Sequence, residues 1–205
     1  MAENMSFERV TTEYYDVLKE LGNIGAGNAT TALAQMLQTK VDMKVPQVRL
    51  LDFKDVGVVM GGEEQLVAGI YLAVEGDITG SIMFILEQNA AKSLVSKLMG
   101  MPPSEGGFTE IEISAMKEIG NIIICSYVNA FTQLVGVEID LSVPSSTVNM
   151  LGGVLTVPMA EYGYETDKLM YINAEFIMDG VKLSDGLLML PDIGSLNGIL
   201  ERLGV

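Results

Sequence analysis

The sequence of 205 residues predicts an α+β fold made of two pseudo-symmetric halves, each with a long helix, several antiparallel strands and a short closing helix, packed as one domain. A repeat is the first observation: residues 19–24 read Lys-Glu-Leu-Gly-Asn-Ile and residues 117–122 read Lys-Glu-Ile-Gly-Asn-Ile, an offset of 98 residues. The second is that each copy lies in a stretch with helical apolar spacing, followed by strand-like runs between Gly-containing turns. Because strands joined by short turns pair antiparallel, two repeats of about 11–100 and 109–204 are expected to share one domain over 1–205.

The first helix is predicted to begin near Thr11 or Thr12, and its apolar residues recur at helical spacing. Three glycines lower its intrinsic stability by up to about 1 kcal/mol each against Ala, so tertiary packing is expected to hold it. The apolar positions are Leu18, Leu21, Ala29, Ala32, Leu33 and Met36, and the glycines are Gly22, Gly25 and Gly27.

The second helix has a clear start. Thr109-Glu110-Ile111-Glu112 is a capping box, which places the first helical residue near 110. Its apolar residues then recur with the helical period as Met116, Ile119, Ile123, Tyr127, Ala130 and Leu134.

Runs rich in Val, Ile and Leu predict four strands in each half, and a short helix then closes each half. The closing helices are predicted over 88–99, where Gly100 and Pro102 stop the helix, and over 192–203, opened by Pro191 and Asp192. The link between the halves is 101–107. The predicted strands are 46–52, 56–60, 66–75 and 79–86 in the first half, and 137–143, 153–160, 169–178 and 186–190 in the second.

Composition excludes several classes of function. Twelve basic and 27 acidic residues give a net charge of −15, which argues against nucleic acid and anionic membranes as partners. The absence of histidine removes Ser-His-Asp and Cys-His catalysis and the usual His/Cys zinc sites, so no metal site is expected. A single cysteine, an acidic and polar N-terminal stretch and the lack of an apolar run of about 18 residues predict a cytoplasmic protein without membrane spans.

Each predicted helix carries a polar stripe opposite its apolar face. At about 100° per residue, Glu20 and Asn23 fall side by side on the outer side of the first helix. Glu118 and Asn121 repeat this in the second helix, whereas Gly22 and Gly120 fall on the buried side and are assigned to close packing. One such pair is ordinary on a solvated helix, but its recurrence and the modest helix propensity of Asn suggest selection for the amide.

The repeated pattern is Asp/Ser-x₃-Glu-x₂-Asn-x₂₂-Pro, and it resembles the phosphatase motif of the CheC/CheX/FliY family of chemotaxis response-regulator phosphatases. The Gly-Asn-Ile-Gly-Ala-Gly-Asn-Ala stretch after Glu20 also resembles that family, and the two-motif chain without a further domain is similar to its CheC-type members. The two motifs are Asp16, Glu20, Asn23 and Pro46, and Ser114, Glu118, Asn121 and Pro144.

This resemblance implies an enzyme that hydrolyses the aspartyl phosphate of a CheY-type response regulator. It implies that Asn23 and Asn121 orient the attacking water, a role that a carboxamide can fill because it both accepts and donates hydrogen bonds. Glu20 and Glu118 would pair with a lysine of the regulator, and Mg²⁺ would come with the regulator, so no cofactor of its own is expected. Asp16 and Ser114 are expected to support the sites, and Pro46 and Pro144 to fix the turn from helix to sheet. Cys125, at the position equivalent to Gly27, is not expected to be catalytic because no basic cluster surrounds it.

The resemblance also implies the CheD receptor deamidase as a second partner. Duplication supplies internally the twofold arrangement that a one-motif relative obtains by dimerising, which favours a monomer. The alternative function is a non-catalytic adaptor that binds the regulator or CheD. A glycosidase-like carboxylate pair has no other support in the sequence. Whether the two sites are equally active is left open.

Overall fold

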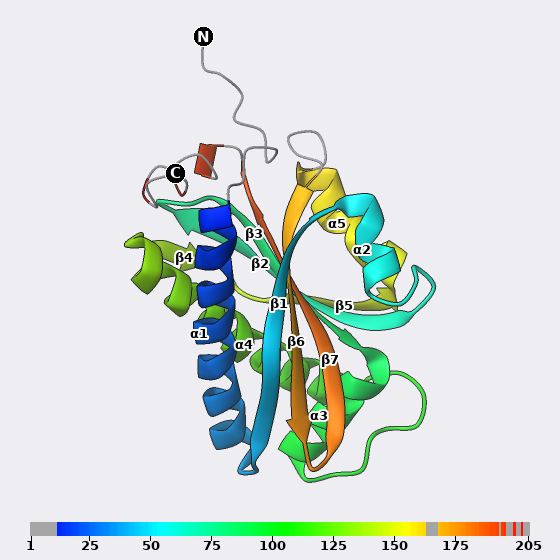
Figure 1. Cartoon of the computed structure of the whole chain (residues 1–205). Helices are drawn as coiled ribbons and strands as arrows, with labels where there is room; N and C mark the ends of the chain where they lie inside the picture. The colour runs from blue at the N-terminus through cyan, green and yellow to red at the C-terminus, as the bar shows by residue number, and fades with distance from the viewer. Residues whose placement is uncertain (1–11, 163–167, 193, 196–198, 200–201, 203–205) are drawn as a thin grey trace.

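The computed structural model describes residues 12–162, 168–192, 194–195, 199 and 202. Within them one antiparallel sheet of seven strands is covered by helices on both faces (Figure 1), which confirms the predicted α+β class. The strand order is β1-β6-β7-β3-β2-β4, and β5 also pairs with β2. The strands are β1 Val41–Asp52, β2 Leu66–Gly76, β3 Gly80–Glu87, β4 Ile139–Leu141, β5 Ser145–Met150, β6 Lys168–Met178 and β7 Val181–Pro191. The helices are α1 Thr12–Leu37, α2 Phe53–Val59, α3 Gln88–Met99, α4 Glu110–Val135 and α5 Leu151–Tyr162.

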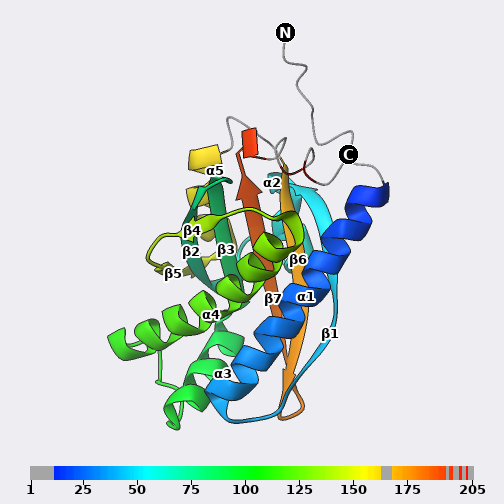
Figure 2. The same ribbon diagram turned by 90° about the vertical axis from the view of Figure 1, so that its left-hand side faces the viewer.

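The sheet separates two apolar clusters, because successive side chains of a strand point to opposite faces. Helices α1, α3 and α4 cover one face and bury the larger cluster, to which Ile82 and Phe84 of β3 contribute. The short helices α2 and α5 cover the other face, where Met83 and Ile85 of the same strand point. Figure 2 shows α1 and α4 crossing over the same face of the sheet.

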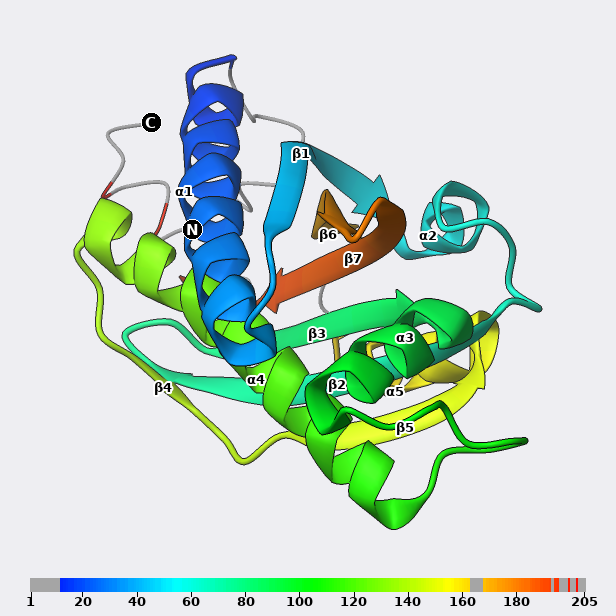
Figure 3. The same ribbon diagram turned by 90° about the horizontal axis from the view of Figure 1, so that it is seen from below.

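The two halves are interwoven rather than placed side by side. β1 of the first half pairs with β6 of the second, and β4 and β5 of the second half pair with β2 of the first. The hairpins β2–β3 and β6–β7 meet through the central β3–β7 pair. Figure 3 shows the result: β1 and β6 lie at one end of the sheet, and β2 and β5 lie at the other.

The motif prolines lie in matching irregularities of the two outer strands. In β1 the register shifts by one residue between Lys44 and Gln47, around Pro46. In the second half β4 ends at Leu141 and β5 begins at Ser145, and Pro144 lies in this break. Proline has no N–H for a ladder, so it is tolerated at such a bulge in an edge strand. The structure thus places both prolines within the outer strand, beyond the turn from helix to sheet that they were expected to fix.

Two predicted strands were wrong. Residues 56–60 lie largely in α2 and residues 153–160 lie in α5. Helices α2 and α5 bury residues at helical spacing against the second face of the sheet, such as Phe53 and Val56 of α2, and a short apolar run does not distinguish helix from strand. β5, which is mostly polar, was not predicted. Closing helix 88–99 is confirmed, whereas most of 192–203 lies outside the described residues.

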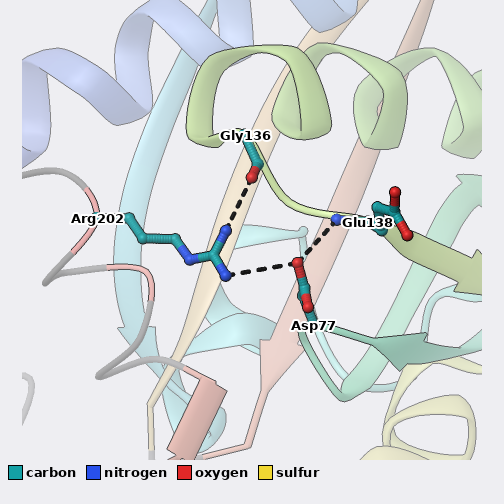
Figure 4. Close-up of polar contacts among 4 residues, drawn as sticks. All are labelled: Asp77, Gly136, Glu138 and Arg202. Atoms are coloured by element: carbon teal, nitrogen blue, oxygen red, sulfur yellow. Dashed lines mark hydrogen bonds and ion pairs between the residues drawn. The ribbon is translucent and has the colours of Figure 1, made fainter.

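Two clusters of hydrogen bonds join the halves, each centred on an aspartate in a turn between two strands. Asp77, in the β2–β3 turn, accepts hydrogen bonds from the Glu138 backbone N–H at 3.2 Å and from Arg202 at 3.5 Å. Arg202 also donates to the carbonyl oxygen of Gly136, which ends α4, at 2.8 Å (Figure 4). In the second cluster Asp179, in the β6–β7 turn, accepts hydrogen bonds from Lys97 of α3 at 2.7 Å and from Thr39 at 3.3 Å. Each turn aspartate therefore binds a cation from the closing segment of the other half.

Candidate active site

The first candidate site lies on α1 where this helix packs against β1. A Cβ atom on Gly22 would come within 2.8 Å of Val48 Cγ2 and 3.6 Å of Pro46 Cγ, so the glycine allows the helix backbone to approach the strand closely. Glu20 and Asn23, on either side of this contact in sequence, are exposed. The assignment of Gly22 to close packing is confirmed.

Asn23 lines an open surface hollow of about 400 Å³ between α1 and the bulged part of β1. The hollow's charged residues are both basic, Lys19 and Arg49. The amide is thus within reach of a group entering from outside, beside positive charge on a chain whose net charge is −15. The lining residues are Lys19, Asn23, Val45, Pro46, Gln47, Val48 and Arg49.

The second candidate site lies on α4, where this helix packs against β2 rather than against the outer strand. A Cβ atom on Gly120 would lie 2.7 Å from Ile70 of β2, so here too the glycine allows close packing. Ser114 and Glu118 are exposed, whereas Asn121 is half-buried. Cys125, one turn further along the helix, donates from Sγ to Oδ1 of Asn121 at 3.7 Å.

The two sites differ at their supporting residues. Asp16 forms an ion pair with Lys19 at 3.2 Å, and both side chains are exposed. The equivalent of Asp16 is Ser114, which has no charge to pair with Lys117. Burial, and next the negative charge of Glu118, raise the pKa of the Cys125 thiol, so it is protonated at neutral pH and available as a donor to the amide.

The structure brings each Glu/Asn pair together on its own helix, but it does not merge the two pairs. Among the described residues no hydrogen bond or ion pair joins Asp16, Glu20 or Asn23 to their counterparts on α4. Nor do any three acidic or cysteine side chains of the described part of the chain gather as metal ligands. In that same part, every helix is too short or too polar to cross a membrane.

Sequence reasoning missed the strand side of the site. Val45 and Arg49 line the hollow beside Asn23, although they lie more than 20 residues further along the chain. A signal for them was present, because the dipeptide Val-Pro recurs at 45–46 and 143–144, at the same offset as the helix motif.

Two family models match this chain: the CheC-like family at residues 15–49, and the chemotaxis phosphatase CheX at residues 68–164. The chain is 33% identical to the CheY-P phosphatase CheC of Bacillus subtilis (strain 168), an alignment that covers 97% of each chain. In fold it resembles Thermotoga maritima FliY, with a TM-score of 0.73, 21% identity and coverage of 95% of this chain and 97% of that one. It also resembles a chain of the CheX-CheY-BeF3-Mg complex from Borrelia burgdorferi, with a TM-score of 0.56, 16% identity and coverage of 81% and 94%.

Fold and site together define an α+β protein with a Glu/Asn pair on each of its two long helices, in which both glutamates and Asn23 are exposed and Asn121 is half-buried. Identity of 33% over nearly the whole of both chains assigns the family. The chain belongs to the CheC family of chemotaxis phosphatases.

Proposed function

We propose that this chain hydrolyses the aspartyl phosphate of a CheY-type response regulator, with one Glu/Asn site in each half. The relative from B. subtilis is named a CheY-P phosphatase, and the CheX protein that shares this fold was crystallised with CheY, BeF3 and Mg²⁺. The single observation that carries the proposal is the repeated helix motif, in which Glu20, Asn23 and Glu118 are exposed and Asn121 is half-buried, while the intervening glycine packs on the sheet.

The chemistry needs little from the phosphatase. An aspartyl phosphate is an activated acyl phosphate, and the regulator's acidic pocket supplies the Mg²⁺, so this chain needs no cofactor of its own. Asn23 and Asn121 enter that pocket, and each carboxamide accepts a hydrogen bond from the attacking water and holds it in line with the phosphorus. A neutral amide does this without a proton transfer of its own.

The two glutamates fix the register of docking. Glu20 lies one turn before Asn23, so a lysine of the regulator that pairs with Glu20 orients the receiver as the amide enters. Glu118 does the same for Asn121. Asp16 supports the first site by holding Lys19, and Ser114 takes the equivalent place in the second.

The test is phosphate release from a Mg²⁺-bound, phosphorylated CheY-type receiver. Asn23→Ala and Asn121→Ala each remove one site. In the double variant the rate of phosphate release is expected to fall by at least about 100-fold, because a reactant misplaced by about 1 Å costs a factor of that size. Asn28→Ala on α1 and Asn129→Ala on α4 are matched controls, since both are exposed asparagines of the same two helices. They are expected to leave the rate unchanged.

The competing proposal is an adaptor that binds the regulator or the CheD deamidase without hydrolysis. The adaptor proposal replaces the phosphatase proposal if the unmodified protein does not accelerate phosphate release, even with CheD present. CheD binding, a monomeric state and a cytoplasmic location belong to the proposal as well, and sedimentation with and without CheD tests the first two.

A further inference from the structure

Two valines in equivalent positions are among the most exposed apolar residues of the described chain. Val45 exposes 77% of its surface and Val143 exposes 88%. They are 98 residues apart, the offset of the repeat, and each directly precedes a motif proline. Single exposed apolar residues are common, but the same exposed valine at both copies of one site is not explained by chance placement.

Strand register places both valines at equivalent positions of the outer strands, although α1 packs on the outer strand itself and α4 packs on its neighbour β2. Gly22 packs on Val48, whose ladder partner is Ile172. Gly120 packs on Ile70, whose ladder partner is Ser146. Val48 and Ser146 are equivalent positions, and the exposed valine lies three residues before each of them, directly before the motif proline. The bulge in β1 takes Val45 out of the regular alternation, and Val143 lies in the break between β4 and β5, so both side chains are exposed.

Comparison of the two outer strands shows which positions have been retained. Only three of the twelve aligned pairs between 41–52 and 139–150 are identical. The buried Val48 has become Ser146, so a position that packs in the core has diverged, whereas the exposed valine has not. The identical pairs are Asp42 and Asp140, Val45 and Val143, and Pro46 and Pro144. Packing within this chain therefore does not account for retaining the valine.

We propose that Val45 and Val143 are apolar docking contacts for the phosphorylated response regulator, one at each site. This inference rests on the proposed function. Val45 lines the same hollow as Asn23, so a receiver that admits the amide must also cover the valine. The hollow's other contribution, the positive charge of Lys19 and Arg49, suits an acidic, phosphate-bearing partner. A central apolar contact that loses its water supports binding more than the polar groups around it.

Each valine is tested with only its own site active. Val45→Thr is made in the Asn121→Ala protein and Val143→Thr in the Asn23→Ala protein, because threonine keeps the branched shape and strand preference but replaces one methyl group by a hydroxyl. The expected result is a rise in KM of about fivefold with kcat unchanged, since a docking contact is made equally before and during the chemical step. Val58→Thr is the matched control, because Val58 is 81% exposed but lies on α2, on the opposite face of the sheet, and is expected to leave KM unchanged.

Each other outcome has a definite meaning. An unchanged KM in both valine variants overturns the inference while the proposed function stands. A fall in kcat alone also overturns it, because the valine then acts on the chemistry rather than on docking. If the parent protein is a dimer by sedimentation and the double Val45→Thr, Val143→Thr variant is a monomer, the valines bind a second copy of this chain instead.

Failure of the proposed function is recognised separately. A parent protein that releases no phosphate still allows titration against the Mg²⁺- and beryllofluoride-loaded receiver. A fivefold weaker Kd in the threonine variants then supports the docking role without catalysis, and equal Kd values overturn it.

Discussion

The crossing of α1 and α4 rests on Gly25, and replacing this residue gives a sharp test. A Cβ atom at this position would lie 2.3 Å from Cδ1 of Tyr127 and 2.9 Å from two further ring carbons. Carbon atoms in contact prefer about 3.5–4.0 Å, so the helix or the ring must move by more than 1 Å. Tyr127 is 1% exposed, and buried side chains are close-packed, so moving its ring displaces its neighbours.

Opposing effects set the size of the change. Alanine is favoured over glycine inside a helix by about 1 kcal/mol, whereas overpacking a close-packed core costs about 1–3 kcal/mol. The steric contact at Gly25 is severe, so the overpacking cost lies at the upper end of this range, about 3 kcal/mol. After the gain of about 1 kcal/mol in helix propensity, Gly25→Ala is expected to lower the free energy of unfolding by about 2 kcal/mol. Gly27→Ala is the matched control on the same helix. Its Cβ would meet nothing within 4 Å, and the variant is expected to gain about 1 kcal/mol.

Urea denaturation followed by circular dichroism measures the free energy of unfolding of both variants, and thermal unfolding measures their Tm. For a chain of this size, Tm should fall by about 4–8 °C in Gly25→Ala and rise by about 2–4 °C in Gly27→Ala. Adding Tyr127→Leu to Gly25→Ala removes the ring and should make the two changes non-additive. Equal stabilisation by both alanines would refute the close crossing of the two helices.

Three further measurements follow from polar contacts in the structure. Hydrogen bonds, first of all from the Thr109 backbone N–H, lower the pKa of Glu112 from 4.5 to about 2, so its stabilising effect is complete above pH 4.5 and is lost as the pH falls toward 2. Glu112→Gln should therefore flatten the dependence of Tm on pH between 6 and 2. Because burial and Glu118 raise the pKa of the Cys125 thiol, iodoacetamide should modify it more slowly than a free cysteine at pH 8, and Glu118→Gln should speed the reaction measured by mass spectrometry. Arg202→Ala should lower the stability by about 1 kcal/mol in thermal unfolding, less in 1 M salt, since its ion pair is exposed and its bond to a helix-ending carbonyl is charge-assisted.

Helical periodicity and the repeat were sufficient to predict the two long helices and the outward position of Glu20, Asn23 and Glu118. Strands β2, β3 and β6 were also predictable from runs rich in apolar residues, whereas only 186–190 of β7 was predicted because Lys182, Ser184 and Asp185 interrupt its first half. Asn121 is less exposed than its spacing implied, and the neighbouring Cys125 bonds to it in a way that a wheel projection does not show.

Strand pairing between the halves was not predictable. The local sequence of β1 specifies an extended edge strand, with Pro46 and alternating burial, but it is equally compatible with either half's sheet. The choice of β6 over β2 depends on contacts more than 100 residues away. The hollow beside Asn23 was not predictable either, since its lining residues on α1 and β1 are distant in sequence and come together only after folding.

The exchange of outer strands between the halves has a consequence for synthesis on the ribosome. β1 is complete at residue 52, but its ladder partner ends at residue 178. At translation rates of about 5–20 residues per second, the nascent strand waits on the order of 10 s before it can pair. Its charged residues and its bulge at Pro46 discourage pairing with other chains during that interval. Protease digestion of stalled nascent chains should accordingly cleave β1 until β6 has left the exit tunnel, so the first half of this protein reaches its folded state only after most of the second has been made.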